Sequence, residues 1–211
     1  MCKQAIGINS TKSTTRMDTV THVLHYPQRP IVYTKSSEIL GFNEMPAGDN
    51  LIVAIATHTG YNIEDSMIIN RSSIERGLFH STFYRTYIAE EKKNMSALAE
   101  EKFCIPDAEK CIGMRTGDYN LLDSNGLVRE NTKVGGEDII IGKMTPIIGK
   151  NNSSKKDIKY KDTSTQLRYN EEGIVDKVQM THNSDGYQLA KVKIRTIKIP
   201  EIADKAASRH G

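Results

Sequence analysis

Two adjacent carboxylates stand in a short polar loop between two apolar runs of the sequence. Glu64 and Asp65 lie within Gly60–Ser66, and a loop held between rigid strands is a common mount for catalytic groups. Carboxylate oxygens suit a hard cation such as Mg2+, which takes few protein ligands and keeps water and phosphate oxygens around it. A Glu-Asp pair in a loop is also, most often, simply solvated. The pair is therefore a candidate magnesium contact, and the residues alone leave both interpretations open.

A second candidate is the basic end of the chain. Tyr187–Gly211 carries six basic side chains against two acidic ones. Within it, Lys205 could neutralise phosphate as a mobile point charge and Arg209 as a bidentate fork. Near the other end, Lys3 and Gln4 could likewise bond a nucleic-acid backbone. A solvated basic terminus explains the same residues, and by spacing alone that interpretation is favoured.

The elements around the carboxylate loop can be predicted from turn and cap signals. Leu51–Thr57 is a continuous apolar run typical of a buried strand, and Ser66–Asn70 indicates a second short strand. Ser72–Glu75 has the spacing of a capping box, and Gly77 offers a stop. The sequence therefore predicts one short helix after the second strand.

The second half of the chain alternates apolar and polar residues as strands do. Gly173–Met180 and Gln188–Pro200 are predicted strands, joined by a hairpin turn at Asn183–Gly186. Lys150–Lys156, rich in lysine, asparagine and serine, is typical of a solvated loop. Three basic residues of the second strand fall on one face at a period of two: Lys191, Lys193 and Arg195. Long stretches of 3.6-residue periodicity are scarce, so the chain is predicted to be mainly β.

Bulk composition narrows the class of protein without naming a function. The 211 residues, 37% of them hydrophobic, suffice for one substantial core or two small ones. A formal charge of +3 is too balanced to diagnose a nucleic-acid partner. Three cysteines without CxxC spacing indicate reduced intracellular thiols rather than a disulfide framework or a zinc site. The longest apolar run falls far short of the ~20 residues of a spanning helix, so no membrane is expected.

These segments together resemble the second-largest subunit of multisubunit, DNA-dependent RNA polymerases, nearest to the eukaryotic polymerase II type. The resemblance covers nearly the whole chain, with its segments in family order and spacing. The matching segments are Lys3–Gly7, Arg16–Thr19, Tyr26–Pro30, Leu40–Gly48, Gly60–Ser66, Ser72–Phe79, Gly136–Lys143, Glu172–Asp176 and Asp204–Gly211. Each segment alone is weakly specific, and the set is highly specific.

The resemblance implies a mainly β fold with short helices, made of a double-psi β-barrel portion that binds the RNA–DNA hybrid and a wall, or flap, portion. It places a first hybrid-binding segment at 1–81, the wall at 82–198 and the start of a second hybrid-binding segment at 199–211. The implied function is template-directed RNA synthesis as part of a multisubunit enzyme. The isolated chain is expected to be inactive.

The resemblance also assigns roles to the candidate residues. Asp65, with Glu64 beside it, would approach the second Mg2+, which arrives with the nucleoside triphosphate. Lys205 would lie near the RNA 3′ end and the incoming phosphates, and Gln4 near the RNA of the hybrid. Arg209 belongs to the same family segment as Lys205. Implied partners are the largest subunit, which holds the permanent metal, the smaller subunits, DNA template, RNA transcript and substrate.

The sequence departs from the family pattern at two positions that are usually glycine. Glycine usually precedes the aspartate of the Lys205 segment, and Ala203 stands there; Cys2 replaces a usual glycine near the start. Either change matters only where φ is positive. The family segment also continues after Gly211 with a further functional lysine. Three hypotheses would explain why the family segment is interrupted at Gly211: an incomplete reading frame, a split subunit or an inserted intein. The expected location of the protein is the nucleus, or a virus factory or virion for a large DNA virus.

Two other functions remain open at this point. A non-catalytic module could bind nucleic acid or polymerase subunits without taking part in chemistry. An independent Mg2+-dependent nuclease built on Glu64 and Asp65 is disfavoured, because no third carboxylate or general base is spaced to complete such a site.

Overall fold

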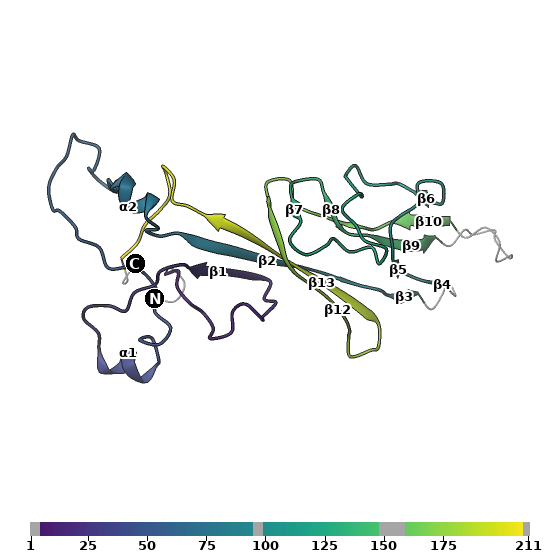
Figure 1. Ribbon diagram of the computed structural model, residues 1–211, viewed down its shortest axis with the longest axis horizontal. Helices are drawn as coiled ribbons and strands as arrows, with labels where there is room; N and C mark the ends of the chain where they lie inside the picture. Colours follow the sequence, from purple (N-terminus) through teal and green to yellow (C-terminus); the bar gives the residue numbers. More distant parts are fainter. Residues whose placement is uncertain (1–4, 95–98, 148–158, 209–211) are drawn as a thin grey trace. The chain divides into compact units, whose positions relative to one another are not determined.

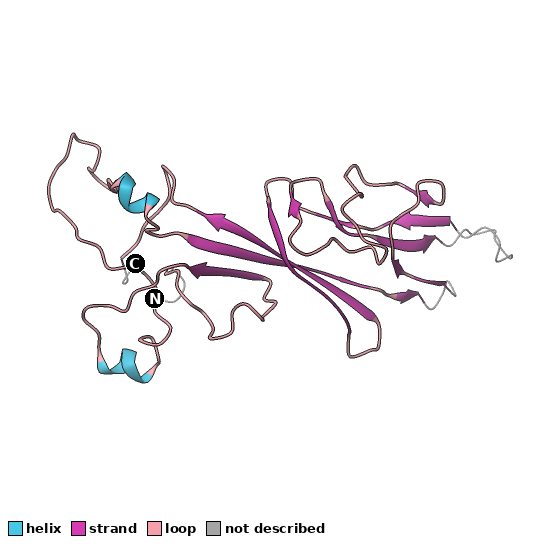
Figure 2. Cartoon of the chain, in the orientation of Figure 1, coloured by secondary structure: helices cyan, strands magenta, loops and turns pink. Residues whose placement is uncertain are grey.

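The computed structural model describes residues 5–94, 99–147 and 159–208, and strands dominate them (Figures 1 and 2). The two helices are α1 (Lys35–Ile39) and α2 (Arg71–Glu75). The strands are β1 (Val20–Leu24), β2 (Ser81–Glu90), β3 (Lys93–Asn94), β4 (Ala99–Glu100), β5 (Lys102–Phe103), β6 (Cys111–Ile112), β7 (Lys133–Val134), β8 (Ile139–Ile141), β9 (Lys143–Ile147), β10 (Lys159–Asp162), β11 (Thr165–Gln166), β12 (Gly173–His182) and β13 (Gln188–Lys198). The prediction of a mainly β chain with short helices is confirmed.

The chain divides into two compact units. The first contains Met1–Arg16, Val20–Phe83 and Ile197–Gly211, and the second contains Met17–Thr19 and Tyr84–Thr196. The division falls inside β2 and β13, so each of these strands contributes residues to both units.

The second unit is built around the β12–β13 hairpin. The two strands pair antiparallel, β2 follows on the far side of β13, and β7 follows on the far side of β12. The turn begins at Asn183, whose side chain accepts hydrogen bonds from two backbone N–H groups, and it contains Gly186 at a φ of 82°. The hairpin predicted from sequence is therefore confirmed.

A single apolar core lies under this hairpin. On β13 the apolar residues Ala190, Val192 and Ile194 are buried, because alternate side chains of a strand point to the same face of the sheet. β8 and β11 pair antiparallel, and all three β8 isoleucines are inaccessible to solvent. The buried cluster consists of Leu127, Val128, Val134, Ile140, Ile141, Leu167, Val175, Ala190, Val192 and Ile194.

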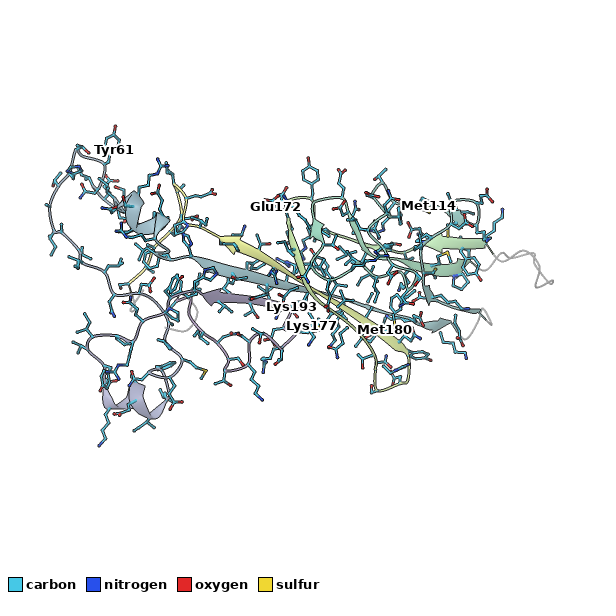
Figure 3. The ribbon with its side chains drawn as sticks, viewed as in Figure 1. Tyr61, Met114, Glu172, Lys177, Met180 and Lys193 are labelled. Carbon is cyan, nitrogen blue, oxygen red and sulfur yellow. The ribbon has the colours of Figure 1, made fainter. Side chains whose placement is uncertain are left out.

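An ion cluster engages two of the three basic residues that the sequence places on one face of β13. The β12–β13 register shifts at Asp176, whose carboxylate reaches two β13 cations. One oxygen accepts from Arg195 at 2.7 Å and the other lies 3.7 Å from Lys193 Nζ. Figure 3 labels Lys193, which lies on β13. Its Nζ stands 4.3 Å from the ring centroid of Tyr84, and the residue is 2% exposed. The Lys193 side chain therefore lies in the interior of the second unit and does not form part of a phosphate-binding surface.

A buried carboxylate, Asp162 at the end of β10, joins separate segments of the second unit. Asp162 accepts hydrogen bonds from the Tyr119 hydroxyl, from Arg115 N at 3.0 Å and from Ser164 N at 2.9 Å. Burial alone would raise the pKa of Asp162, but hydrogen bonds from Ser164, Tyr119 and Arg115 outweigh it and lower that pKa. Burial and the same carboxylate raise the pKa of Tyr119 to about 12.

Replacing Asp162 with alanine is expected to lower the free energy of unfolding by about 2–3 kcal/mol at pH 7, because buried donors lose a charged acceptor. The depressed pKa of Asp162 stabilises the fold above the unfolded value of about 3.9, and this contribution disappears as pH falls through the folded pKa. Urea titrations at pH 7 and pH 3 measure both effects. Asp185→Ala, an exposed carboxylate, is the control and should change stability by less than about 0.5 kcal/mol. A difference between wild type and Asp162→Ala that grows on acidification would contradict the assignment.

The first unit has few buried side chains among its described residues. β1 contributes Leu24, which is 4% exposed, and Leu24 N donates to Gly7 O at 3.1 Å. α1 begins after Thr34, whose side chain accepts from Ser37 N. α2 begins after Asn70, whose side chain accepts from Ser73 N at 3.3 Å. The predicted short helix is confirmed, but its cap is Asn70 rather than Ser72.

The two strands predicted before α2 are wrong. Leu51–Thr57 and Ser66–Asn70 have no strand assignment. Ile52 and Ile55 are fully exposed, at 106% and 101% of their reference area. An apolar run becomes a strand only where a neighbouring strand supplies hydrogen bonds, and none of the described residues pairs with these segments. The double-psi barrel of the first unit therefore stays a prediction.

Three further sequence predictions concern a polar loop, the cysteines and membrane-spanning helices. Lys150–Lys156 and Cys2 lie outside the described residues. Cys104 and Cys111 are both free thiols. Over the described ranges, no helix is long and apolar enough to cross a bilayer.

Candidate functional site

The carboxylate loop belongs to a long excursion of the first unit that is anchored at its base. Asp49 Oδ2 accepts from Phe79 N at 3.3 Å, which joins the start of the excursion to its end. Asn50 Nδ2 donates to Arg29 O at 2.8 Å, and Asn50 N donates to Gln28 Oε1 at 3.1 Å. Burial raises the pKa of Asp49, and the Phe79 N–H opposes this shift. These bonds hold the two ends of the excursion while its middle stays exposed.

One side chain, Asn62, connects the residues that precede the carboxylates. Its Oδ1 accepts from His58 N at 2.9 Å, and its Nδ2 donates to Ala56 O at 2.6 Å. Between these contacts the chain turns through Thr59 at a φ of 54° and Gly60 at 75°. Figure 3 labels Tyr61 at the outer end of this loop, and its residue is 76% exposed. The loop is therefore closed by an amide side chain rather than by strand pairing.

Glu64 and Asp65 occupy the turn that follows. Glu64 has a φ of 64°, a left-handed conformation that non-glycine residues seldom adopt. Ser66 Oγ donates to Ile63 O at 2.5 Å, so the turn is closed on its far side. Both carboxylates are exposed, and among the described residues neither makes a hydrogen bond or ion pair. Two unpaired carboxylates are therefore presented together to solvent.

This donor set fits a shared rather than a self-contained magnesium site. Carboxylate oxygens are suitable Mg2+ ligands, and the ion takes octahedral coordination in which substrate phosphates and waters commonly fill several positions. In the described part of the chain, no group of three or more His, Cys, Asp or Glu side chains could hold a metal. Glu64 and Asp65 can thus contribute one or two ligands to an ion whose other ligands come from elsewhere.

Lys205 follows a second exposed turn of the first unit. Asp204 N donates to Glu201 O at 3.2 Å, and Glu201 N donates to Asp204 Oδ2 at 2.9 Å. Ala203, between them, has a φ of 79°. Alanine therefore stands at a position whose backbone conformation favours glycine, the residue that the resemblance leads us to expect there. Lys205 itself is exposed, and within the described residues it has no ion pair with Glu64 or Asp65.

Ala203→Gly is expected to stabilise this turn by about 1 kcal/mol, because glycine adopts positive φ without the Cβ clash. Since the turn is exposed, the effect should appear locally, as about fivefold slower hydrogen exchange of the Asp204 amide measured by NMR. Ala206→Gly, at a position without positive φ, provides the matched control and should not slow that exchange. Equal effects of the two substitutions would exclude strain at Ala203.

The remaining predicted contacts cannot be placed. Lys3, Gln4 and Arg209 lie outside the described residues, so their proximity to Lys205 or Asp65 is still a prediction.

Sequence reasoning missed the residues that shape the site. Neither Asn62 nor Asp204 belongs to a charge pattern that marks it as a site residue, although Asn and Asp side chains commonly bond nearby backbone groups in turns. That preference was the available signal. It could not specify which backbone groups they would bond.

Comparisons with known proteins connect these features to one protein family. A family model described as RNA polymerase Rpb2, domain 6 matches residues 1–211. The chain is 50% identical over 212 residues to the DNA-directed RNA polymerase II subunit RPB2 of Encephalitozoon cuniculi, and 49% identical over 213 residues to the DNA-directed RNA polymerase II subunit 2 of Arabidopsis thaliana. It is 43% identical over 213 residues to the DNA-directed RNA polymerase subunit Rpo2 of Saccharolobus solfataricus.

Each alignment covers 100% of this chain but 18%, 18% and 19% of the respective relatives. The chain thus spans less than a fifth of the length of these curated relatives. The similarity therefore concerns one region of a much longer type of protein.

Proposed function

The chain belongs to the RNA polymerase Rpb2 domain 6 family, and on that premise we propose that it serves as an active-centre segment of the second-largest subunit of a DNA-directed RNA polymerase. The observation that carries the proposal is the family match over the whole chain, at about half identity to polymerase II subunits. The unpaired carboxylates of the Gly60–Ser66 loop are consistent with it, because they are available to ligands from outside the chain.

In the proposed reaction Asp65 is a ligand of the Mg2+ that accompanies the nucleoside triphosphate, and Glu64 stands beside it as a second ligand or a charge partner. When bound, that ion offsets the negative charge of the triphosphate. Asp65 supplies a carboxylate oxygen from an exposed turn, so it can meet an ion carried by the substrate. The two carboxylates favour a divalent cation over a monovalent one by simple charge attraction.

Lys205 is proposed to lie near the RNA 3′ end and the incoming phosphates. Its ammonium group is exposed on a turn that Asp204 closes. A cation there favours the transition state, in which negative charge develops on the transferring group. Gln4, Lys3 and Arg209 are proposed to contact the sugar-phosphate backbone of the RNA–DNA hybrid, where contacts do not discriminate sequence.

The proposed organisation assigns 1–81 and 199–211 to a hybrid-binding region with a double-psi barrel and 82–198 to a wall. The exposed isoleucines of the first unit support assembly, because a run such as Ile52–Ile55 is stable only when other polypeptide covers it. Its proposed partners are the largest and smaller subunits, DNA, RNA and nucleoside triphosphates. The proposed location is the nucleus for a cellular eukaryote, with a virus factory or virion as the alternative.

The experiment that tests this function is purification of the tagged full-length gene product from its native source, followed by subunit identification and a template-dependent RNA synthesis assay. Recovery with a largest subunit and with synthesis that requires both template and Mg2+ is the expected result. Recovery in a complex that binds nucleic acid but synthesises no RNA would favour the non-catalytic module. Recovery without any polymerase subunit would overturn the proposal.

A further inference from the structure

The strongest unassigned feature of the first unit is the double hydrogen bond of Asn62. The side-chain amide accepts from His58 N at 2.9 Å and donates to Ala56 O at 2.6 Å. It thereby joins the apolar run before the loop to the backbone just ahead of the two carboxylates. Asn62 is only partly exposed, whereas Tyr61, Ile63, Glu64 and Asp65 are all exposed.

We propose that Asn62 is a positioning residue that fixes the direction in which the chain enters the Glu64–Asp65 turn. This inference rests on the proposed function, and it adds a residue that acts on the metal contact through the backbone without touching the metal. The turn lies between two closures, the Asn62 bonds on one side and the Ser66–Ile63 bond on the other. Removing the first closure leaves the segment before the turn held, among the described residues, by the Tyr61 N–His58 O bond of 3.3 Å.

The requirement for such a closure follows from the local backbone. Thr59, Gly60 and Glu64 all have positive φ, and each costs energy or entropy unless other contacts hold it in place. None of the described residues pairs with 51–57 or 66–70 as a strand, so ladder hydrogen bonds do not supply that restraint. Among the described residues, the Asn62 amide reaches back across the Thr59–Gly60 bend and bonds the backbone of His58 and Ala56.

The chemistry of asparagine is specific to this arrangement. One bond needs an acceptor and the other needs a donor, and the amide offers both within one short side chain. Aspartate keeps the acceptor for His58 N but loses the donor to Ala56 O. Its added negative charge would by itself attract Mg2+ to the loop. If Asn62 acts by positioning the turn, Asn62→Asp should raise the Mg2+ concentration that the enzyme requires. If the charge of the loop decides, the same substitution should lower that concentration.

The test compares Asn62→Ala, Asn62→Asp and Tyr61→Phe in the complete, assembled polymerase. Tyr61→Phe is the matched control, because within the described residues the Tyr61 hydroxyl has no hydrogen bond. The activity readout is the Mg2+ concentration that gives half-maximal nucleotide addition. It is expected to rise about tenfold for Asn62→Ala and to rise, rather than fall, for Asn62→Asp, while Tyr61→Phe stays at the wild-type value.

A second readout needs no metal and no turnover. Hydrogen exchange of the His58 amide in the metal-free enzyme should accelerate about tenfold in Asn62→Ala and remain unchanged in Tyr61→Phe. Unchanged His58 exchange in Asn62→Ala would overturn the inference. A lower rate of nucleotide addition with an unchanged Mg2+ dependence would also overturn it, since that pattern indicates a purely structural role.

Adding Asp65→Ala to the series separates a failure of this inference from a failure of the proposed function. If the Mg2+ requirement rises for Asp65→Ala but not for Asn62→Ala, the positioning role of Asn62 is refuted and the proposed metal contact stands. An unchanged requirement in both variants removes both.

Discussion

Asp65→Ala is expected to reduce the rate of nucleotide addition by the assembled polymerase about 100-fold at limiting Mg2+ and to raise the Mg2+ concentration needed for half-maximal rate. The carboxylate is exposed and unpaired among the described residues, so its removal breaks no internal contact. The loss should therefore appear in the metal dependence, with assembly and thermal stability unchanged. Single-nucleotide addition measured across a Mg2+ titration provides the check.

Two further substitutions refine this expectation. Glu64→Gln should produce a smaller effect than Asp65→Ala, since Glu64 is proposed only as a second ligand or a charge partner. Glu75→Ala is the matched control, because Glu75 is also an exposed carboxylate but pairs with Arg71 at 3.0 Å on α2. It should leave the Mg2+ dependence at the wild-type value. Normal elongation by Asp65→Ala at limiting Mg2+ would refute the metal contact.

Asp176→Ala is expected to lower the free energy of unfolding of the second unit by about 3–5 kcal/mol, since it removes a carboxylate from beside the buried Lys193 ammonium and breaks the Arg195 bond. The Lys193 side chain is 3% exposed, so water cannot easily replace the lost partner. Arg195, at 38%, can turn toward solvent when its 2.7 Å bond is lost. Urea denaturation monitored by circular dichroism measures the change.

A double mutant distinguishes the buried charge from a simple loss of packing. Asp176→Ala combined with Lys193→Met should recover much of the lost stability, because the buried ammonium group that faced Asp176 is then removed as well. The matched comparison is Asp176→Ala with Lys191→Met, which changes the next cation on the same strand and should recover nothing. Equal recovery in both double mutants would show that Lys193 does not depend on Asp176.

Predictions from local pattern succeeded where the pattern and its partner are close in sequence. The β12–β13 hairpin brings its own pairing strand, its alternating residues and a turn built on Asn183 and Gly186. The short helix at Arg71–Glu75 likewise carries its stop signal at Gly77, although the cap was displaced to Asn70. Local interactions determine both elements, so a single sequence contains the information needed.

Predictions failed where the partner is distant or lies outside the chain. Leu51–Thr57 has the apolar character of a buried strand, yet no described strand pairs with it. Strand formation depends on hydrogen bonds from another segment, and the composition of the run says nothing about which segment supplies them. The same limit applies to the basic face of β13, because the alternation of residues along the strand does not indicate that Lys193 is buried beside Asp176.

The sequence by itself determined the mainly β character, the family resemblance and the candidate Glu64–Asp65 pair, because these depend on residue type, spacing and local turn chemistry. Only the tertiary structure decided that Asn62 closes the loop ahead of that pair, that Ala203 stands at a positive φ, and that Asp176 forms ion pairs with Lys193 and Arg195. Each of these depends on backbone direction and on which groups meet in space. Neither quantity is encoded by spacing along the chain.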